Sequence, residues 1–196
     1  MVPSGTYCDN LALAQSVRHV DGCVVECGVW RGGMSAGMAT VLGRHRQYFL
    51  LDSFQGLPPA SDIDGDAARQ WQRDVTSPFY FDNCSAPEEF ARQAMALADA
   101  PHTQLVAGWF ADTLPSFDPG PIVVLRLDGD WYESTMLCLE RLFDRVVPGG
   151  LVILDDYFAW DGCSRAVHDF LSRRSAVERL RSFGTVCYFS KAPVTP

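Results

Sequence analysis

The 196-residue chain has very little lysine and lacks a long apolar run. Its 16 basic residues are 15 arginines and one lysine, Lys191, against 24 acidic residues, which gives a formal net charge of -8. Nucleic-acid-binding proteins need a basic face for phosphates, and proteins that dock on anionic membranes need basic clusters. No stretch approaches the 18 or so apolar residues of a membrane span. The sequence therefore predicts a protein without nucleic-acid or membrane partners.

Cysteine pairs at disulfide or metal spacing are also missing. The 7 cysteines include no C-x-x-C pair, and four of them lie in apolar stretches: Cys23, Cys27, Cys138 and Cys187. A free cysteine in such a stretch packs as a small apolar side chain. The N-terminus has no basic region followed by a long apolar core, so we expect no signal peptide. These features predict a reduced, cytoplasmic protein with neither a disulfide framework nor a zinc cluster.

Apolar stretches that resemble strands alternate with helical segments along the chain. The predicted strands are residues 23–27, 48–52, 104–108, 122–127 and 151–154, and the predicted helices are residues 31–43, 87–98, 135–147 and 164–173. This alternation predicts an α/β fold with a doubly wound, mostly parallel sheet. Residues 177–183 and 186–190 predict an antiparallel hairpin at the C-terminus. The length and the 47% hydrophobic content favour a single domain over residues 1–196.

Residues 55–86 break the alternation. They are rich in proline, aspartate and glycine, and we expect a long loop there. Long loops in compact domains usually serve function, so this segment is a candidate lid. Its aromatic residues either contact an acceptor molecule or anchor the loop to the core: Trp71, Phe79, Tyr80 and Phe81.

Aspartate is abundant where glutamate is scarce, with 18 residues against 6. Five acids fall at the ends of predicted strands: Glu26, Asp52, Asp128, Asp155 and Asp156. The carboxyl ends of parallel strands form the ligand-binding edge of an open α/β sheet. Each acid alone also fits a helix cap. Clustered carboxylates raise one another's pKa unless a cation or donor compensates, so together they predict a crevice for hydroxyl groups, a metal ion or a cationic ligand.

The first two acids point to a nucleotide-type ligand. Glu26 precedes Gly28 and the pair Gly32-Gly33, which is an acid-then-glycine turn into a helix. Glycines let a ligand approach the backbone closely. Asp52 follows Gly28 by 24 residues, where a βαβ site places a carboxylate on ribose hydroxyls. The turn is not G-x-G-x-x-G, so this pattern does not identify the cofactor.

The later acids predict metal and proton chemistry. Asp128-Gly129-Asp130 and Asp155-Asp156 form an oxygen-rich set that suits Mg²⁺ or Ca²⁺. One acid can bind a metal while another, unligated, accepts a proton.

Five blocks of sequence between about residues 24 and 160 carry a family resemblance. They are residues 25–33 (VECGVWRGG), 52–58 (DSFQGLP), 108–115 (GWFADTLP), 127–135 (LDGDWYEST) and 149–157 (GGLVILDDY). In this order they resemble the macrocin O-methyltransferase family, which includes mycinamicin and novobiocin sugar O-methyltransferases. The resemblance implies a Rossmann-like class I methyltransferase fold, S-adenosylmethionine as donor, and Mg²⁺-dependent methylation of a hydroxyl of a sugar or other vicinal diol on a natural product.

The resemblance also assigns roles by position. It implies Glu26 and Gly28 for the methionine side of the donor, Asp52 and Ser53 for its ribose, Gly108 and Phe110 for its adenine, Asp128, Asp155 and Asp156 for the metal, and Asp130 as general base. The family members carry a longer N-terminal segment that covers the site and helps to assemble oligomers, whereas here the first motif is already reached by Glu26. The lid role of residues 55–86, the acceptor and the formation of a homo-oligomer therefore stay open.

Other patterns suggest alternatives. Residues 33–37 (GMSAG) match the G-x-S-x-G nucleophile elbow of α/β-hydrolases, but Ser35 falls inside a predicted helix and not on the turn after a strand. A nicotinamide-dependent oxidoreductase is a second alternative. A catalytically silent cofactor-binding protein is a third, and the clustered aspartates argue against it. Residues 62–66 (DIDGD) have the glycine too early for a calcium loop, so we expect a solvated acidic turn.

Overall fold

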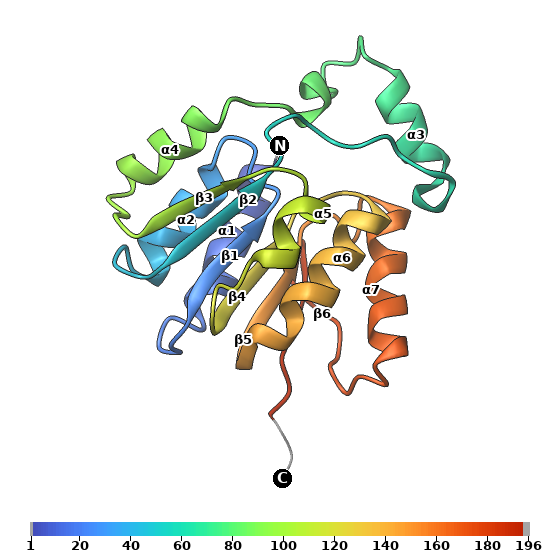
Figure 1. The fold of residues 1–196 in the computed structure, drawn as a ribbon. Helices are drawn as coiled ribbons and strands as arrows, with labels where there is room; N and C mark the ends of the chain where they lie inside the picture. Colours follow the sequence, from blue (N-terminus) through green and yellow to red (C-terminus); the bar gives the residue numbers. More distant parts are fainter. Residues whose placement is uncertain (1, 194–196) are drawn as a thin grey trace.

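The computed structural model describes residues 2–193, and its centre is a seven-stranded sheet with the order β3-β2-β1-β4-β5-β7-β6. The parallel strands are β1 (Cys23–Cys27), β2 (Tyr48–Asp52), β3 (Thr103–Ala107), β4 (Ile122–Leu127) and β5 (Val146–Leu154). The antiparallel strands are β6 (Arg181–Phe183) and β7 (Val186–Ser190). The predicted mostly parallel α/β sheet with a C-terminal hairpin is confirmed (Figure 1).

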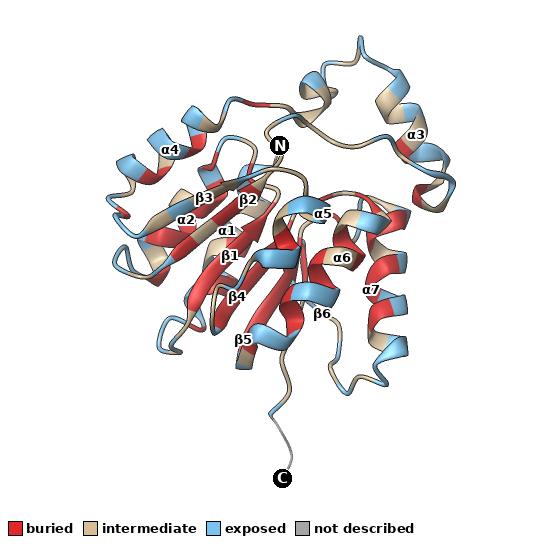
Figure 2. Cartoon of the chain, viewed as in Figure 1, coloured by how far each residue is buried: buried red, intermediate tan, exposed pale blue. Residues whose placement is uncertain are grey.

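Helices cover both faces of the sheet. One face carries α1 (Ser4–Gln15), α2 (Gly33–Leu42) and α4 (Glu88–Leu97), and the other carries α5 (Phe110–Thr113), α6 (Tyr132–Leu142) and α7 (Asp161–Arg173). Short 3-10 turns complete the chain: η1 (Asp62–Asp64), η2 (Phe81–Cys84), η3 (Leu114–Ser116) and η4 (Phe143–Arg145). Figure 2 shows buried residues along the central strands and on the sides of α6 and α7 that face them.

The central strands are apolar because helices exclude water from both of their faces. Every residue of β1 and β4 is buried, and apolar side chains along β1 alternate between the two layers. Val24 joins the layer under α1 and α2, whereas Val25 joins the layer under α6 and α7. Two charged residues interrupt this pattern, Glu26 on β1 and Arg126 on β4, and both lie near the carboxyl ends of their strands.

The boundary between α6 and β5 differs from the prediction. The predicted helix ran to residue 147 and the predicted strand began at residue 151, but α6 ends at Leu142, and β5 begins at Val146 and includes residues 148–150 (PGG). Ile122 pairs with Val146, but Val124 already pairs with Leu151, so the extra residues form a bulge in β5. A bulge places proline and glycine inside a strand without breaking the ladder around them.

The predicted loop over residues 55–86 contains regular structure. It includes α3 (Gly65–Arg73) between η1 and η2. Ala68 of α3 is fully buried, and the other residues of the helix are exposed or partly buried. Figure 1 shows α3 above the carboxyl ends of the strands, outside the two helical layers. The segment therefore has the place of a cover over this edge, and its movement as a lid stays a prediction.

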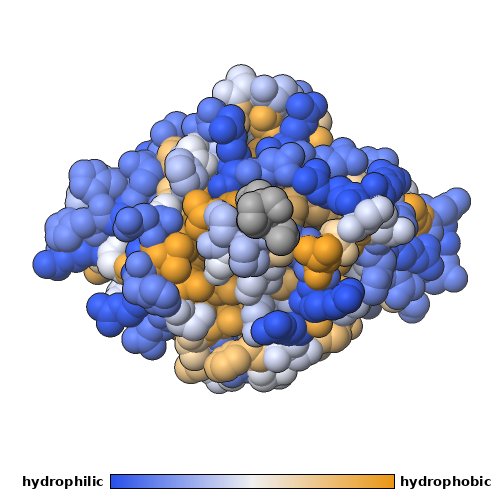
Figure 3. Space-filling model, turned by 90° about the horizontal axis from the view of Figure 1, so that it is seen from below, coloured by the Kyte–Doolittle hydropathy of each residue, from blue (hydrophilic) through white to orange (hydrophobic). Residues whose placement is uncertain are grey.

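The opposite end of the molecule has a mixed surface. Seen from below, hydrophobic residues lie in separate patches among hydrophilic ones (Figure 3). Within residues 2–193, no helix combines the length and the apolar character that crossing a membrane requires.

Candidate active site

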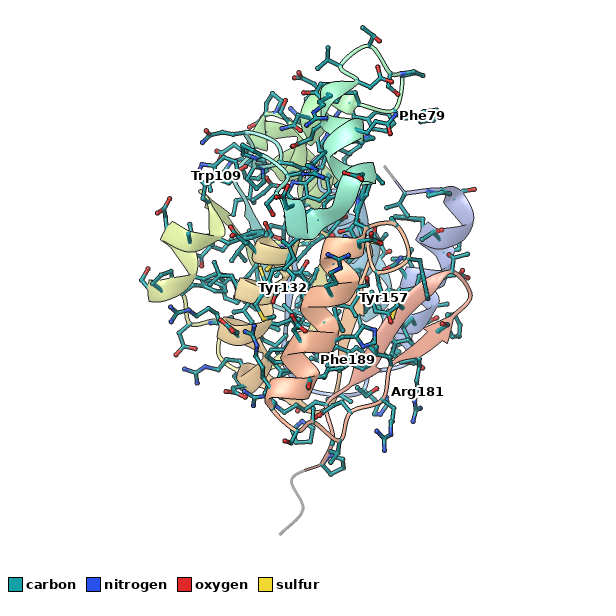
Figure 4. All side chains as sticks on the ribbon, turned by 90° about the vertical axis from the view of Figure 1, so that its right-hand side faces the viewer. Phe79, Trp109, Tyr132, Tyr157, Arg181 and Phe189 are labelled. Carbon is teal, nitrogen blue, oxygen red and sulfur yellow. The ribbon has the colours of Figure 1, made fainter. Side chains whose placement is uncertain are left out.

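A cavity of about 990 Å³ opens at the carboxyl edge of the sheet. The turn after β1, the ends of β2, β4 and β5, and residues of the segment that carries α3 line it. Phe79 of that segment lies near the top of Figure 4, above the sheet. Seven acids line the cavity: Glu26, Asp52, Asp128, Asp130, Glu133, Asp155 and Asp156. The acids at the strand ends thus share one site.

Arg126 is the charge at the centre of this acidic group. Its side chain is fully buried, and Nη1 lies 2.6 Å from Glu26 Oε1 and 2.8 Å from Asp128 Oδ2. Nη2 lies 2.5 Å from Asp155 Oδ1, although the two groups are not aligned for a hydrogen bond. Arg126 lies on β4 and Asp128 directly follows this strand, two residues later, so the extended chain turns both side chains to the same side. One guanidinium therefore faces three carboxylates, which leaves an excess of negative charge.

Burial, and for Asp130 and Asp156 also the neighbouring carboxylates, raises the pKa values of the acids. Burial raises the pKa of Glu26 to about 7, although Arg126 and the Ser35 hydroxyl favour the ionised form. Burial, together with the charge of Asp128, raises the pKa of Asp130 to about 7. Burial and the charge of Asp130 raise the pKa of Asp156 well above its usual value. A cation in this cavity would favour the ionised forms.

Three of the acids have the geometry of a metal site. Asp128, Asp130 and Asp156 each offer one carboxylate oxygen, and these oxygens lie within 4.8 Å of one another. Asp155 instead turns one oxygen to Arg126. The structure thus groups Asp130 with two of the predicted metal ligands, and the division into ligands and general base stays a prediction.

Asp130 is held in place from two sides. Its Oδ1 accepts a hydrogen bond from Trp160 Nε1 at 2.8 Å, and its backbone N–H donates to Asp156 Oδ2 at 2.9 Å. Its φ of 56° is one that L-residues rarely adopt. Sequence reasoning missed Trp160, because an indole four residues after Asp156 carries no motif of its own.

The glycine turn approaches the end of β4 closely. Gly28 has a φ of 87°, and a Cβ at this position would lie 1.7 Å from the carbonyl oxygen of Asp128. Asp52 fixes the other side of the turn, since Oδ2 accepts the backbone N–H groups of Val29 at 2.7 Å and Trp30 at 2.8 Å. In this structure Asp52 organises the turn, and its contact with a ribose stays a prediction.

The remaining residues predicted for the ribose and the adenine of the donor are Ser53, Gly108 and Phe110. Ser53 and Phe110 line the cavity, and the sequence did not single out Trp109, which lines it as well. Gly108 donates its N–H to the Asp52 carbonyl at 2.9 Å and is not among the residues that line the cavity in the described part of the chain.

Ser35 lacks the setting of a hydrolase nucleophile. It lies inside α2, is fully buried, and donates a hydrogen bond to Glu26. A nucleophile elbow would expose the serine on the turn directly after a strand. The structure therefore agrees with the sequence argument against a hydrolase.

The acidic turn at residues 62–66 is solvated only in part. Asp62 and Asp66 are exposed and pair with Arg69, as a solvated turn requires. Asp64 is buried, and its Oδ1 accepts the N–H of Tyr132, the first residue of α6, at 2.7 Å. Its Oδ2 accepts the N–H and the hydroxyl of Ser61. The S-x-x-D spacing of a capping box could have predicted this burial.

Comparison with known proteins assigns the chain to a family. The profile of the macrocin O-methyltransferase (TylF) family matches residues 9–191. The chain belongs to the macrocin O-methyltransferase family. It is 40% identical over 174 residues to the 8-demethyl-8-(2,3-dimethoxy-alpha-L-rhamnosyl)-tetracenomycin-C 4'-O-methyltransferase of Streptomyces olivaceus, and the match covers 85% of this chain. It is 36% identical over 168 residues to the demethyldecarbamoylnovobiocin O-methyltransferase of Streptomyces niveus, over 83% of this chain.

Solved structures agree with this placement in the macrocin O-methyltransferase family. The O-methyltransferase NovP matches with a TM-score of 0.78 and 29% identity over 94% of this chain and 80% of that one. The family resemblance and the fold expected from the sequence are therefore confirmed. The chain spans 63% of the length of each of the two Streptomyces relatives.

Proposed function

We propose that this chain is an S-adenosylmethionine- and Mg²⁺-dependent O-methyltransferase that acts on a hydroxyl of a sugar, or of another vicinal diol, in a small-molecule natural product. The observation that carries the proposal is the convergence of Asp128, Asp130 and Asp156 in the cavity that the glycine turn also lines. The Streptomyces olivaceus relative is named for 4'-O-methylation of a rhamnosyl group, which supports a sugar acceptor.

The donor would lie between the glycine turn and the end of β2. S-Adenosylmethionine supplies the methyl group, whose carbon passes from the sulfonium sulfur to the acceptor oxygen. Asp52 holds the turn through the N–H groups of Val29 and Trp30, so the chain presents a fixed backbone to this ligand. The net negative charge of the cavity suits a cationic sulfonium. Glu26, Gly28, Ser53, Gly108 and Phe110 are the further residues that we assign to the donor.

The donor set at the acidic edge fits a hard divalent cation. Carboxylate oxygens are the ligands that Mg²⁺ prefers. Burial and neighbouring carboxylates raise the pKa values of Asp128 and Asp156, and a bound cation would favour their ionised forms. We assign the metal to Asp128, Asp155 and Asp156. Bound there, Mg²⁺ would orient neighbouring acceptor hydroxyls and lower the pKa of one of them.

Asp130 is the residue that we assign as proton acceptor. Burial and the charge of Asp128 raise the pKa of Asp130, and a cation bound beside it would favour the ionised form that accepts a proton. Trp160 occupies Oδ1, which leaves Oδ2 for the proton of the acceptor hydroxyl. Holding this oxygen beside the hydroxyl lowers the entropic part of the barrier.

A methyl-transfer screen tests the proposal. The purified full chain is incubated with labelled S-adenosylmethionine, Mg²⁺ and a panel of glycosylated tetracenomycins, aminocoumarins, macrolides and simple catechols. We expect transfer to at least one sugar or diol hydroxyl, loss of transfer in EDTA, and its return with Mg²⁺. Turnover that EDTA leaves unchanged would remove the metal from the proposal.

Binding measurements separate the alternatives. We expect calorimetry to show binding of S-adenosylhomocysteine. Tight binding of NADH without binding of S-adenosylhomocysteine would instead favour an oxidoreductase, and labelling of Ser35 by a fluorophosphonate probe would favour a hydrolase. Binding of S-adenosylhomocysteine without transfer to any acceptor would favour a silent cofactor-binding protein.

A further inference from the structure

Three tryptophan side chains pack together above the acidic edge. Trp71 comes from α3, Trp131 directly precedes α6, and Trp160 directly precedes α7. The ring centroids of Trp131 and Trp160 lie 5.3 Å apart, and that of Trp71 lies 6.0 Å from Trp160 and 6.3 Å from Trp131. Their planes meet at steep angles between 63° and 71°, the edge-to-face packing that aromatic rings prefer. Each ring is therefore fixed by the other two.

The three indole N–H groups have different acceptors. Trp71 donates to the Phe79 carbonyl at 3.1 Å, Trp131 to the Pro58 carbonyl at 2.9 Å, and Trp160 to Asp130 Oδ1 at 2.8 Å. Of the three, Trp160 is thus the tryptophan whose N–H meets a carboxylate, and a hydrogen bond to a charged acceptor is stronger than one to a carbonyl.

We propose that Trp160 is a positioning residue that fixes the carboxylate of Asp130 for proton transfer. The inference rests on the proposed function, in which Asp130 accepts the proton of the acceptor hydroxyl. The backbone of Asp130 is held by its N–H bond to Asp156, but that bond leaves the carboxylate free to rotate. The bond from Trp160 to Oδ1 removes this freedom and directs Oδ2 away from the indole.

The competing positions for the carboxylate explain why this bond matters. Oxygens of Asp128 and Asp156 lie within 4.8 Å of an oxygen of Asp130, so a cation bound to those two residues would also attract Asp130. By holding Oδ1, Trp160 keeps part of the carboxylate out of such a site. Trp71 packs against Trp160 from α3, so the segment above the edge also braces this arrangement.

An NMR measurement tests the contact without an acceptor or a donor. Indole N–H signals are recorded on the ¹⁵N-labelled full chain at pH 8.5, well above the pKa of about 7 of Asp130, and the signal of Trp160 is assigned by its loss in Trp160→Phe. We expect Asp130→Asn to move the Trp160 signal upfield, because a charged acceptor becomes neutral, and to move the Trp131 signal less. A Trp160 signal that Asp130→Asn leaves in place would overturn the inference.

Kinetics test the consequence. Trp160→Phe keeps an aromatic ring and removes the donor, and Trp131→Phe is a matched control that removes an N–H bond to a backbone carbonyl. With the best acceptor of the panel, we expect Trp160→Phe to lower kcat about 10- to 100-fold, the scale on which misplacing a reacting group acts. S-Adenosylhomocysteine affinity should stay within about twofold of the wild type in both variants, as expected of a residue that acts on the chemical step.

The outcomes separate the inference from the proposed function. Equal kcat values for Trp160→Phe and Trp131→Phe would overturn the positioning role, as would a joint loss of kcat and S-adenosylhomocysteine affinity in Trp160→Phe, which would indicate a collapsed site. If the wild type transfers no methyl group to any acceptor, the proposed function fails, and the NMR shifts still decide whether Trp160 holds Asp130.

Discussion

Two groups of aspartates with the same local spacing have opposite environments in this molecule. The edge aspartates (Asp128, Asp130, Asp155 and Asp156) follow β4 and β5, and the turn aspartates (Asp62, Asp64 and Asp66) lie in the segment that carries α3. Each group contains the pattern D-x-D. The edge aspartates line a cavity around a buried arginine, whereas Asp62 and Asp66 of the turn group pair with Arg69 at the surface.

The difference lies in where the chain puts each group, since composition and spacing are alike. The end of a buried parallel strand removes water from a carboxylate, and desolvation is the largest cause of the raised pKa values at the edge. A turn at the surface leaves water in contact with the charge. The ionised forms of the acids at the sheet edge are therefore unfavourable in the empty cavity, and a bound metal ion or cationic ligand would stabilise them.

The largest expected effect is on catalysis, in Asp130→Asn. The amide cannot accept a proton, and we expect kcat to fall about 10²- to 10⁴-fold, the usual contribution of a general base. The measurement is methyl transfer to the best acceptor, with S-adenosylhomocysteine affinity determined in parallel. Asp66→Asn makes the same chemical change in the turn group and should leave kcat unchanged. A normal rate in Asp130→Asn would assign the base to another group.

The next effect is on folding, in Arg126→Met. Removing the guanidinium leaves Glu26, Asp128 and Asp155 without their buried partner, and losing one member of a buried ion pair costs about 3–5 kcal/mol. Urea unfolding at pH 7.5 measures the change. The control is Arg69→Met, which removes the arginine of the turn group and should leave the urea midpoint near that of the wild type. Equal shifts in the two variants would contradict the comparison.

A smaller effect on stability is expected at Asp64, the residue at which the contrast between edge and turn aspartates is weakest. This turn aspartate is buried and caps α6, so it behaves like an edge residue. Asp64→Asn turns an N–H donor toward the donors of Ser61, and leaving buried groups unpaired costs about 1–3 kcal/mol. Thermal unfolding of Asp64→Asn and Asp62→Asn side by side checks this. If Asp62→Asn lowers the unfolding temperature as much as Asp64→Asn, the difference in burial between the two residues does not determine their contribution to stability.

The sheet edge could be predicted well from the sequence, because the residues that indicate it are neighbours in the chain. The apolar run of β4 and the acid at its end are consecutive residues, and topology alone brings them to the edge shared with β1 and β5. The family resemblance added the division of roles among the acids. The pairing of Arg126 with Glu26 is different, since it joins two strands across 100 positions of sequence. No periodicity in either strand predicts it.

The segment above the edge was the least predictable part. Its helix α3 has only one fully buried position, Ala68, so no apolar stripe marked it in the sequence. The positive φ values of Phe81, Asp82, Asn83 and Cys84 form a left-handed turn that L-residues adopt only when contacts impose it. Here the side-chain amide of Asn83 donates to the Leu57 carbonyl at 2.7 Å, a contact across the segment that only the fold reveals.

The last expected effect is a slope of stability with pH. The pKa of Glu26 is raised from 4.5 to about 7, and that of Asp130 from 3.8 to about 7. At a pH between the ordinary and the raised pKa values, the folded protein retains protons that the unfolded chain has released. The stabilisation is therefore complete below the ordinary pKa values and is lost as the pH rises through 7. The pKa of Glu26 already includes the charge of Arg126, which favours the ionised form and limits the rise.

Urea midpoints of the metal-free protein at pH 5.5 and pH 8 measure this slope, and we expect the lower midpoint at pH 8. Glu26→Gln removes one of the titrating groups and should flatten the slope, whereas the turn variant Asp62→Asn should keep it. Mg²⁺ at pH 8 should recover part of the loss, because a ligand that binds only the folded state stabilises it. A midpoint that rises between pH 5.5 and pH 8 in the metal-free protein would mean that other groups of the chain already balance the negative charge of the edge aspartates. A bound cation would then not be needed to stabilise their ionised forms.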